Sequence, residues 1–192
     1  MKSGATVILG LVLGGLVACC QANAFSWGWC PTVEVMNDFN ITAYFGRWFE
    51  ILRFENTEFE EGYKCIHADY SARDDGLVNV VNFATHENNG VSRSLEGFAF
   101  APNPKAPAKL EMNLGSSYFI GDFWVLDTDY ENFAMVHSCD NYFFFNYQLN
   151  WLLSRTQTLE TGDVQDALRE FEDAGIYVTS FIESDQTGCS EF

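Results

Sequence analysis

The chain has 192 residues, of which 27 are acidic and 10 are basic, and its formal net charge is −17 at pH 7. A surface this acidic repels phosphate backbones and anionic headgroups, which argues against nucleic acid and most membrane surfaces as partners and against stable membrane insertion. The length suits a single domain, and the 18 Phe, 8 Tyr and 5 Trp fit a molecule with an apolar interior and a charged exterior.

Residues 1–24 have the pattern of a cleaved signal peptide. Lys2 precedes an apolar run over 7–18, and Ala22-Asn23-Ala24 provides a small-residue cleavage site. The run is shorter than the ~20 residues that a spanning helix needs. The alternative is a bacterial lipoprotein box ending at Cys19, which is disfavoured because the later cysteines resemble an oxidised extracellular framework. We therefore expect a secreted, extracellular protein with residues 25–192 as one domain.

Most of the chain after residue 24 consists of short segments in which apolar and polar residues alternate, as is typical of β-strands. Asn88-Asn89-Gly90 predicts a tight hairpin turn, whereas Pro102, Pro104 and Pro107 predict a connection outside the sheet. The alternation predicts eight strands, at 48–54, 65–71, 77–85, 91–100, 108–114, 122–127, 133–138 and 149–154.

A helical pattern follows the eighth strand. Apolar residues spaced i, i+3, i+4 and i+7 predict an amphipathic helix over 164–174, with Thr161 or Asp163 as its cap and Gly175 as its end. Residues 176–182 then predict a short ninth strand. The fold class we expect is all-β: an eight-stranded antiparallel up-and-down barrel with one C-terminal helix packed outside, wide enough inside for one small ligand.

Four cysteines remain after the signal peptide, and an even number in a secreted chain indicates disulfides. They allow three pairings, among which the sequence alone does not choose. The same secreted context makes Asn40-Ile41-Thr42 a site of N-glycosylation, the alternative being an unused turn.

Three segments resemble the signatures of the lipocalin family. Gly46 and Trp48 lie in a G-x-W motif, Thr128-Asp129-Tyr130 resembles the second motif, and Arg155 resembles the arginine that closes the eighth strand. Within the family, residues 30–189 are most similar to the group of apolipoprotein D and the insect bilin-binding proteins. The order and spacing of the three motifs agree with the family.

The resemblance implies a barrel closed at one end and open at the other, with Arg155 laid over the Trp48 ring at the closed end. It also implies the pairings Cys30–Cys139 and Cys65–Cys189, each worth roughly 4–5 kcal/mol in the chain-entropy model. The motif residues are then structural rather than ligand-binding: Gly46, Trp48, Thr128, Asp129, Tyr130 and Arg155.

Alternation gives each strand two faces, and the resemblance selects the inner one. The inner face mixes small and large side chains with few polar atoms, which is typical of a small-molecule site. A filled core is the alternative, which we favour for basal residues such as Val136 and Leu153. Glu50 is the one inward carboxylate in this reading, which disfavours a cationic ligand. The side chains expected to contact a ligand are Ala68, Tyr70, Val80, Asn82, Leu95, Met112, Leu114, Phe123, Val125, Leu149 and Trp151.

An aromatic run from Tyr142 to Tyr147 lies between the seventh and eighth strands. An exposed aromatic loop at the barrel mouth would act as a lid, a membrane-touching entry point or an oligomer contact. The alternative is that these residues extend the two strands. Insect bilin binders have a more charged, histidine-containing loop there, which weakens the bilin interpretation.

The sequence contains no nucleophile elbow, zinc motif, P-loop or C-x-x-C pair, and its histidines are too scattered to indicate a metal site. The resemblance leaves no free cysteine in the mature chain, so we do not expect an enzyme. We expect a secreted carrier for one apolar molecule, such as a lipid, retinoid, carotenoid or bilin, with no required cofactor. The alternative is an adhesive or inhibitory module that acts through its acidic outer surface.

Overall fold

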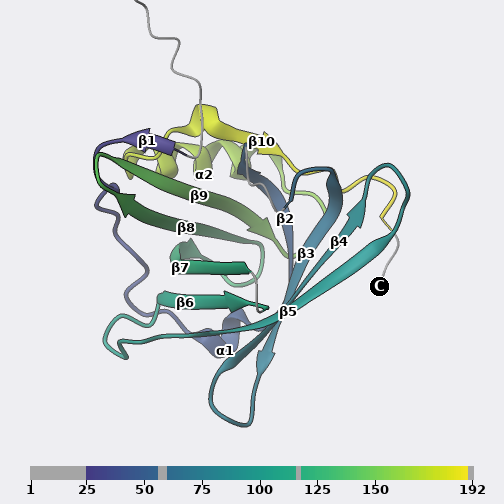
Figure 1. Ribbon diagram of the computed structural model, residues 1–192, viewed down its shortest axis with the longest axis horizontal. Coiled ribbons are helices and arrows are strands. Elements are labelled where there is room, and N and C mark those ends of the chain that lie inside the picture. Colours follow the sequence, from purple (N-terminus) through teal and green to yellow (C-terminus); the bar gives the residue numbers. More distant parts are fainter. Residues whose placement is uncertain (1–24, 56–59, 116–117, 190–192) are drawn as a thin grey trace, which may run out of the picture.

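The computed structural model describes residues 25–55, 60–115 and 118–189; the expected signal peptide lies outside them. Within this part of the chain, ten strands form one antiparallel sheet, and an additional pairing between its strands β2 and β9 closes a barrel (Figure 1). The predicted eight-stranded barrel is confirmed. Its strands are β2 (Gly46–Phe54), β3 (Tyr63–Ala72), β4 (Val78–His86), β5 (Ser92–Phe100), β6 (Lys109–Leu114), β7 (Tyr118–Thr128), β8 (Phe133–Tyr142) and β9 (Phe145–Ser154).

One end of the barrel is filled by aromatic side chains. The short helix α1 (Ile41–Tyr44) leads into β2, and the Trp48 indole donates to the Tyr44 carbonyl at 2.9 Å. The Arg155 guanidinium lies 3.7 Å from the centre of the Trp48 ring. Gly46 has φ +100°, and a Cβ there would lie 3.2 Å from Arg155 Nη1, so this position needs glycine. These contacts close the base of the barrel.

The second motif forms the turn between β7 and β8. The Thr128 hydroxyl donates to the Phe133 carbonyl at 2.6 Å, and one Asp129 carboxylate oxygen accepts from the backbone N–H groups of Glu131 and Asn132. The Tyr130 hydroxyl accepts from the backbone N–H of Asn40 at 2.8 Å. The motif therefore joins this turn to the N-terminal segment.

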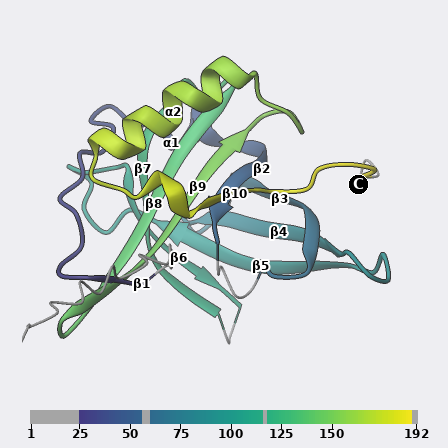
Figure 2. The same ribbon diagram turned by 90° about the horizontal axis from the view of Figure 1, so that it is seen from above.

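Helix α2 (Thr161–Asp173) packs along the outside of the barrel, as Figure 2 shows. Ala167 and Phe171 are buried against an outer core that includes Leu52 and Leu152. The predicted helix is confirmed, and it ends before Gly175, which has φ +80°. The predicted cap was wrong. The helix begins at Thr161, so Thr161 and Asp163 lie in its first turn, and the N-cap residue Glu160 makes no capping hydrogen bond through its side chain.

The chain ends contribute two short strands. β1 (Phe25–Trp27), which the sequence did not predict, pairs with β9, and the Cys30–Cys139 disulfide follows it. The predicted ninth strand at 176–182 begins with two irregular residues and the 3₁₀ helix η1 (Val178–Ser180), and β10 (Phe181–Glu183) pairs with β2 only after it.

The aromatic run forms a hairpin rather than a loop. Pairing between β8 and β9 continues to Tyr142 and Phe145, which leaves Phe143 and Phe144 at the turn. The alternative of extended strands therefore holds. The hairpin tip lies at the open end of the barrel and exposes 90% of Phe143 and 77% of Phe144.

Candidate functional site

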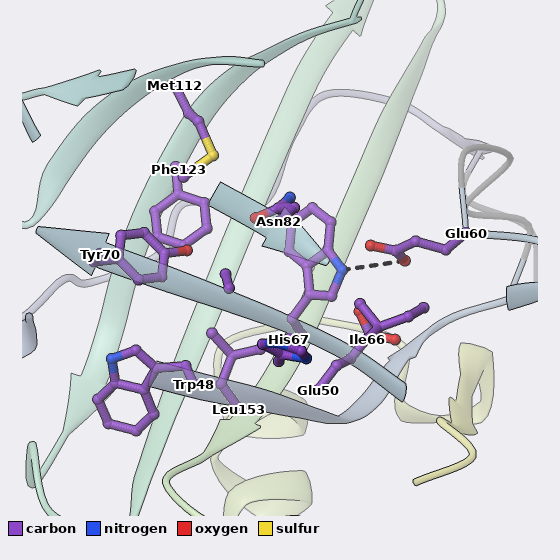
Figure 3. Close-up of a pocket in the computed structure, with 12 residues that line it drawn as sticks. Trp48, Glu50, Glu60, Ile66, His67, Tyr70, Asn82, Met112, Phe123 and Leu153 are labelled. Atoms are coloured by element: carbon purple, nitrogen blue, oxygen red, sulfur yellow. Dashed lines mark hydrogen bonds between the residues drawn. The ribbon is translucent and has the colours of Figure 1, made fainter. Parts of the chain in front are cut away.

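The open half of the barrel contains a hollow with a cavity volume of about 40 Å³ (Figure 3). An adjoining hollow with a cavity volume of about 90 Å³ shares Glu60, Ile66 and Asn82 with it. The walls of the first are mainly apolar and aromatic: Trp48, Ile66, Ala68, Tyr70, Met112, Phe123, Trp151 and Leu153. Such a mixture of apolar walls and a few polar groups is typical of sites for small molecules.

Seven of the predicted ligand-contact residues line one of the two hollows, and the other four pack into the buried core. Leu95 lines the adjoining hollow. Strand alternation identifies the inward face but not how tightly the side chains at each level pack, so the two groups look alike in sequence. Lining the first hollow are Ala68, Tyr70, Asn82, Met112, Phe123 and Trp151. Packed instead into the buried core are Val80, Leu114, Val125 and Leu149.

Two buried carboxylates lie at the polar end of the hollow, where the sequence indicated one. Glu50 is 3% exposed and Glu60 is 7% exposed. Arg53 Nε lies 3.6 Å from Glu50 Oε1 and 3.8 Å from Glu60 Oε2. The Trp151 indole donates to Glu60 Oε2 at 3.5 Å. The expectation of a single inward carboxylate was wrong because Glu60 comes from the connection before β3, and alternation along a strand does not place the residues of a connection.

Burial changes the protonation of this carboxylate pair, Glu50 and Glu60. Desolvation raises the pKa of Glu50 to about 7, although the Ser184 hydroxyl and the Arg53 charge act in the opposite direction. Desolvation also raises the pKa of Glu60 well above its usual range, and the nearby charge of Glu50 adds to this effect. The pair therefore holds at least one proton at mildly acidic pH.

The cavity wall also contains a polar atom that has no partner among the described residues. Asn82 Oδ1 is shielded from solvent and lacks a hydrogen-bond donor there. Tyr70, which is 4% exposed, lines the same hollow. Because buried polar atoms are normally satisfied, the Asn82 oxygen is available to a bound molecule.

The C-terminal tail closes a gap in the wall beside the carboxylate pair. β2 pairs with β3 only over Gly46–Phe49, beyond which β2 pairs with β10. The Gln186 amide bridges the gap by donating to the Glu50 carbonyl at 2.9 Å and the Ile66 carbonyl at 2.8 Å.

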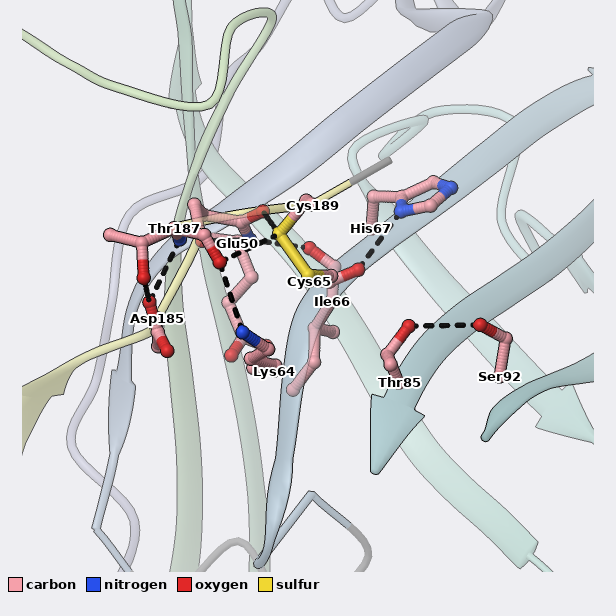
Figure 4. The surroundings of a disulfide bond; sticks show 11 residues. Glu50, Lys64, Cys65, Ile66, His67, Thr85, Ser92, Asp185, Thr187 and Cys189 are labelled. Carbon is pink, nitrogen blue, oxygen red and sulfur yellow. Dashed lines mark hydrogen bonds between the residues drawn. A yellow bond between two sulfur atoms is a disulfide. The ribbon is translucent and has the colours of Figure 1, made fainter. Parts of the chain in front are cut away.

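A disulfide attaches the same tail to β3. Figure 4 shows the Cys65–Cys189 bond beside Lys64, whose ammonium donates to the Thr187 carbonyl at 3.0 Å. With Cys30–Cys139, the structure has the two pairings that the resemblance implied. The tail also carries Ser184, whose hydroxyl donates to Glu50 Oε1.

Other kinds of site find no support in the part of the chain that the structure describes. Over residues 25–55, 60–115 and 118–189, no group of His, Cys, Asp and Glu side chains is arranged to hold a metal ion. Within the same ranges, no helix combines the length and the apolar character needed to cross a bilayer. The cavity is therefore the site that we consider further.

Comparisons with known proteins agree with this geometry. Residues 39–186 match the family described as the lipocalin-like domain. Apolipoprotein D of Cavia porcellus is 34% identical over 190 residues, which cover 98% of this chain and 99% of that protein. Among solved structures, insecticyanin of the tobacco hornworm Manduca sexta is 31% identical and has a TM-score of 0.74, covering 85% of this chain and 89% of that one. Lobster apocrustacyanin A1 has the same fold, with a TM-score of 0.75 at 23% identity, covering 86% and 93% of the two chains. This chain therefore belongs to the lipocalin family.

Proposed function

We propose that the protein is a secreted carrier that binds one small hydrophobic molecule in the open half of its barrel. The observation that supports this most is the contrast between the filled base around Trp48 and the hollow above it, whose walls are apolar. A ligand that buries ~300–400 Å² of apolar surface at ~25 cal/mol/Å² gains roughly 8–10 kcal/mol. The ordering costs of association reduce this figure but leave enough for sub-micromolar binding.

The candidate cargo classes are lipids, retinoids, carotenoids and bilins. A bilin or carotenoid would be bound cargo rather than a cofactor that the fold requires. Protein purified from its natural source distinguishes these classes, because a visible absorption band indicates a pigment and a colourless protein indicates a lipid or retinoid. Mass spectrometry of an organic extract then identifies the molecule.

A cavity-filling substitution tests the proposed site. Ala68→Phe places a ring in the hollow and is expected to weaken binding of 1-decanol, measured by calorimetry, at least tenfold. Ala72→Phe is the matched control, because Ala72 lies on the same strand and is exposed. Equal affinities for the wild type and Ala68→Phe, with circular dichroism showing both folded, would place the ligand elsewhere and overturn the proposed site.

A second candidate function is recognition of a partner through the outer surface. It is favoured by aromatic side chains that cluster where β1 meets the tip of the β8–β9 hairpin. Trp27 is 89% exposed, and the backbone N–H of Gly28 donates to the Phe144 carbonyl at 2.9 Å, which brings the two segments together. We propose that this aromatic rim, which consists of Phe25, Trp27, Trp29, Phe143 and Phe144, is a contact between copies of the protein.

Asn40 also fits the secreted carrier. It is exposed, and its Oδ1 accepts from the backbone N–H of Thr42 at 3.0 Å as the cap of α1. A glycan on Nδ2 would leave that oxygen in place, so we propose that Asn40 is glycosylated. We propose no enzymatic activity, because all four cysteines in the described ranges are in disulfides and no thiolate nucleophile is left there.

A further inference from the structure

We propose that the cavity selects an apolar molecule that carries a basic nitrogen, which binds as an ammonium group at Glu60 and Glu50. This inference rests on the proposed carrier function and names the class of its cargo. It reverses the expectation from the sequence, which placed one carboxylate in the barrel. The argument depends on charge, on an unsatisfied acceptor and on the chemistry of the walls.

The first step concerns charge. The polar end of the hollow brings two carboxylates together with one guanidinium, that of Arg53. When both carboxylates are ionised, these three groups have a net charge of −1 in a place that is largely shielded from water. A buried charge without a partner is unfavourable, so either a proton or a second cation must accompany the pair. The raised pKa of Glu50 is consistent with a retained proton while the cavity holds no cation.

The second step concerns hydrogen bonds. Asn82 Oδ1 is a buried acceptor without a donor, and Asn82 lines both hollows together with Glu60. Tyr70 lines the first hollow as well (Figure 3). An ammonium group has three N–H donors, whereas a carboxylate has none and would be repelled by Glu60. The polar groups therefore match a donor that is positively charged.

The third step concerns the walls. Trp151 and Phe123 line the same hollow, with ring centres 6.5 Å apart, and Met112 lies beside them. Their side chains accommodate an apolar body, and the faces of aromatic rings attract a neighbouring cation. A small polar amine would leave these walls uncovered, so the preferred ligand combines an ammonium group with an alkyl or aryl portion.

The test compares three ligands of equal length, namely decylamine, 1-decanol and decanoic acid, each below the concentration at which it forms micelles. Calorimetry at pH 7 is expected to show that decylamine binds at least tenfold more tightly than 1-decanol, and decanoic acid more weakly than both. Because the ammonium replaces a proton on the pair, titrations in phosphate and in Tris should show proton release for decylamine but not for 1-decanol.

Variants assign this preference to the carboxylate pair. Glu60→Gln is expected to bring the affinity for decylamine to within threefold of that for 1-decanol, both measured on the same variant. Glu61→Gln is the matched control, because the neighbouring Glu61 is exposed, and it should keep the full preference.

The outcomes separate the two proposals. If none of the three ligands binds, the carrier proposal fails. If 1-decanol binds but decylamine shows neither tighter binding nor proton release, the cargo class proposed here is wrong and the carrier remains. The same conclusion follows if folded Glu60→Gln keeps the preference. The comparison of ligands on the wild type decides the question even if that variant does not fold.

Discussion

Replacing Glu50 with glutamine should stabilise the protein in a manner that depends on pH. Burial raises the pKa of Glu50 from 4.5 to about 7 in the folded state. Between these two values the folded state holds a proton that the unfolded state releases, so the contribution of Glu50 to stability decreases as the pH rises from 4.5 to 7. Each unit of pKa difference corresponds to ~1.4 kcal/mol, so the ionised side chain lowers the unfolding free energy by about 3 kcal/mol above pH 7.

Urea denaturation followed by tryptophan emission measures this effect. Glu50→Gln should be about 3 kcal/mol more stable than the wild type at pH 8 and about equally stable at pH 4.5. The pKa of His137, which burial lowers to about 4, also makes stability depend on pH, but it contributes equally to both proteins and cancels in the comparison. Glu183→Gln, a substitution of the same kind at an exposed position, is the control to be measured at the same pH values.

A constant difference between Glu50→Gln and the wild type across this pH range would refute the reasoning. Such a result would mean that water or a counterion reaches the carboxylate pair in the folded protein. The groups that face Glu50 are Glu60, Arg53 and Ser184, so the same titration on Glu60→Gln would show whether the proton belongs to the pair.

Three further predictions concern the framework and the rim. Arg155→Ala should lower the unfolding free energy by about 1–3 kcal/mol, because it removes the cation–π contact and leaves backbone carbonyls at the base without their donor. Urea denaturation measures the loss, and a change below roughly 0.5 kcal/mol, the effect of an ordinary surface substitution, would contradict the prediction. Replacing Cys65 and Cys189 together with serine should cost about 5 kcal/mol in the chain-entropy model, because the loop spans a sequence separation of 124; an unchanged midpoint of thermal unfolding would argue against this. Phe143→Ser combined with Phe144→Ser should abolish any concentration-dependent self-association in analytical ultracentrifugation, whereas persistence of an oligomer would show that the aromatic rim is not its interface.

Most of the fold could be predicted because local signals agree with the global structure. Alternation marks strands such as β6, in which buried Leu110, Met112 and Leu114 alternate with partly exposed residues, and a spacing of 3.6 residues marks α2. Glycine at position 175 marks the end of the helix, because φ is positive there.

Features that depend on distant parts of the chain could not be predicted. β1 has three residues, too few for a periodic pattern, and it forms because β9 offers a free edge. The packing that leaves the middle of the barrel hollow and its base solid depends on side chains from many strands at once. The position of Glu60 could not be predicted either, because it lies between two strands. Only its contacts with Arg53 and Trp151 in the folded structure show that its side chain lies in the barrel.

If the protein is the carrier proposed above, the solid base also determines the direction in which its ligand enters and leaves. Because the Trp48 end of the barrel is closed, the cavity opens at the other end only. A bound molecule would therefore leave through the opening by which it entered. Glu60 comes from the connection at the open end, so an elongated ligand would enter with its apolar end first and keep its polar head near the opening. A membrane or acceptor protein would then meet the head first, and unloading would begin with the loss of that polar contact.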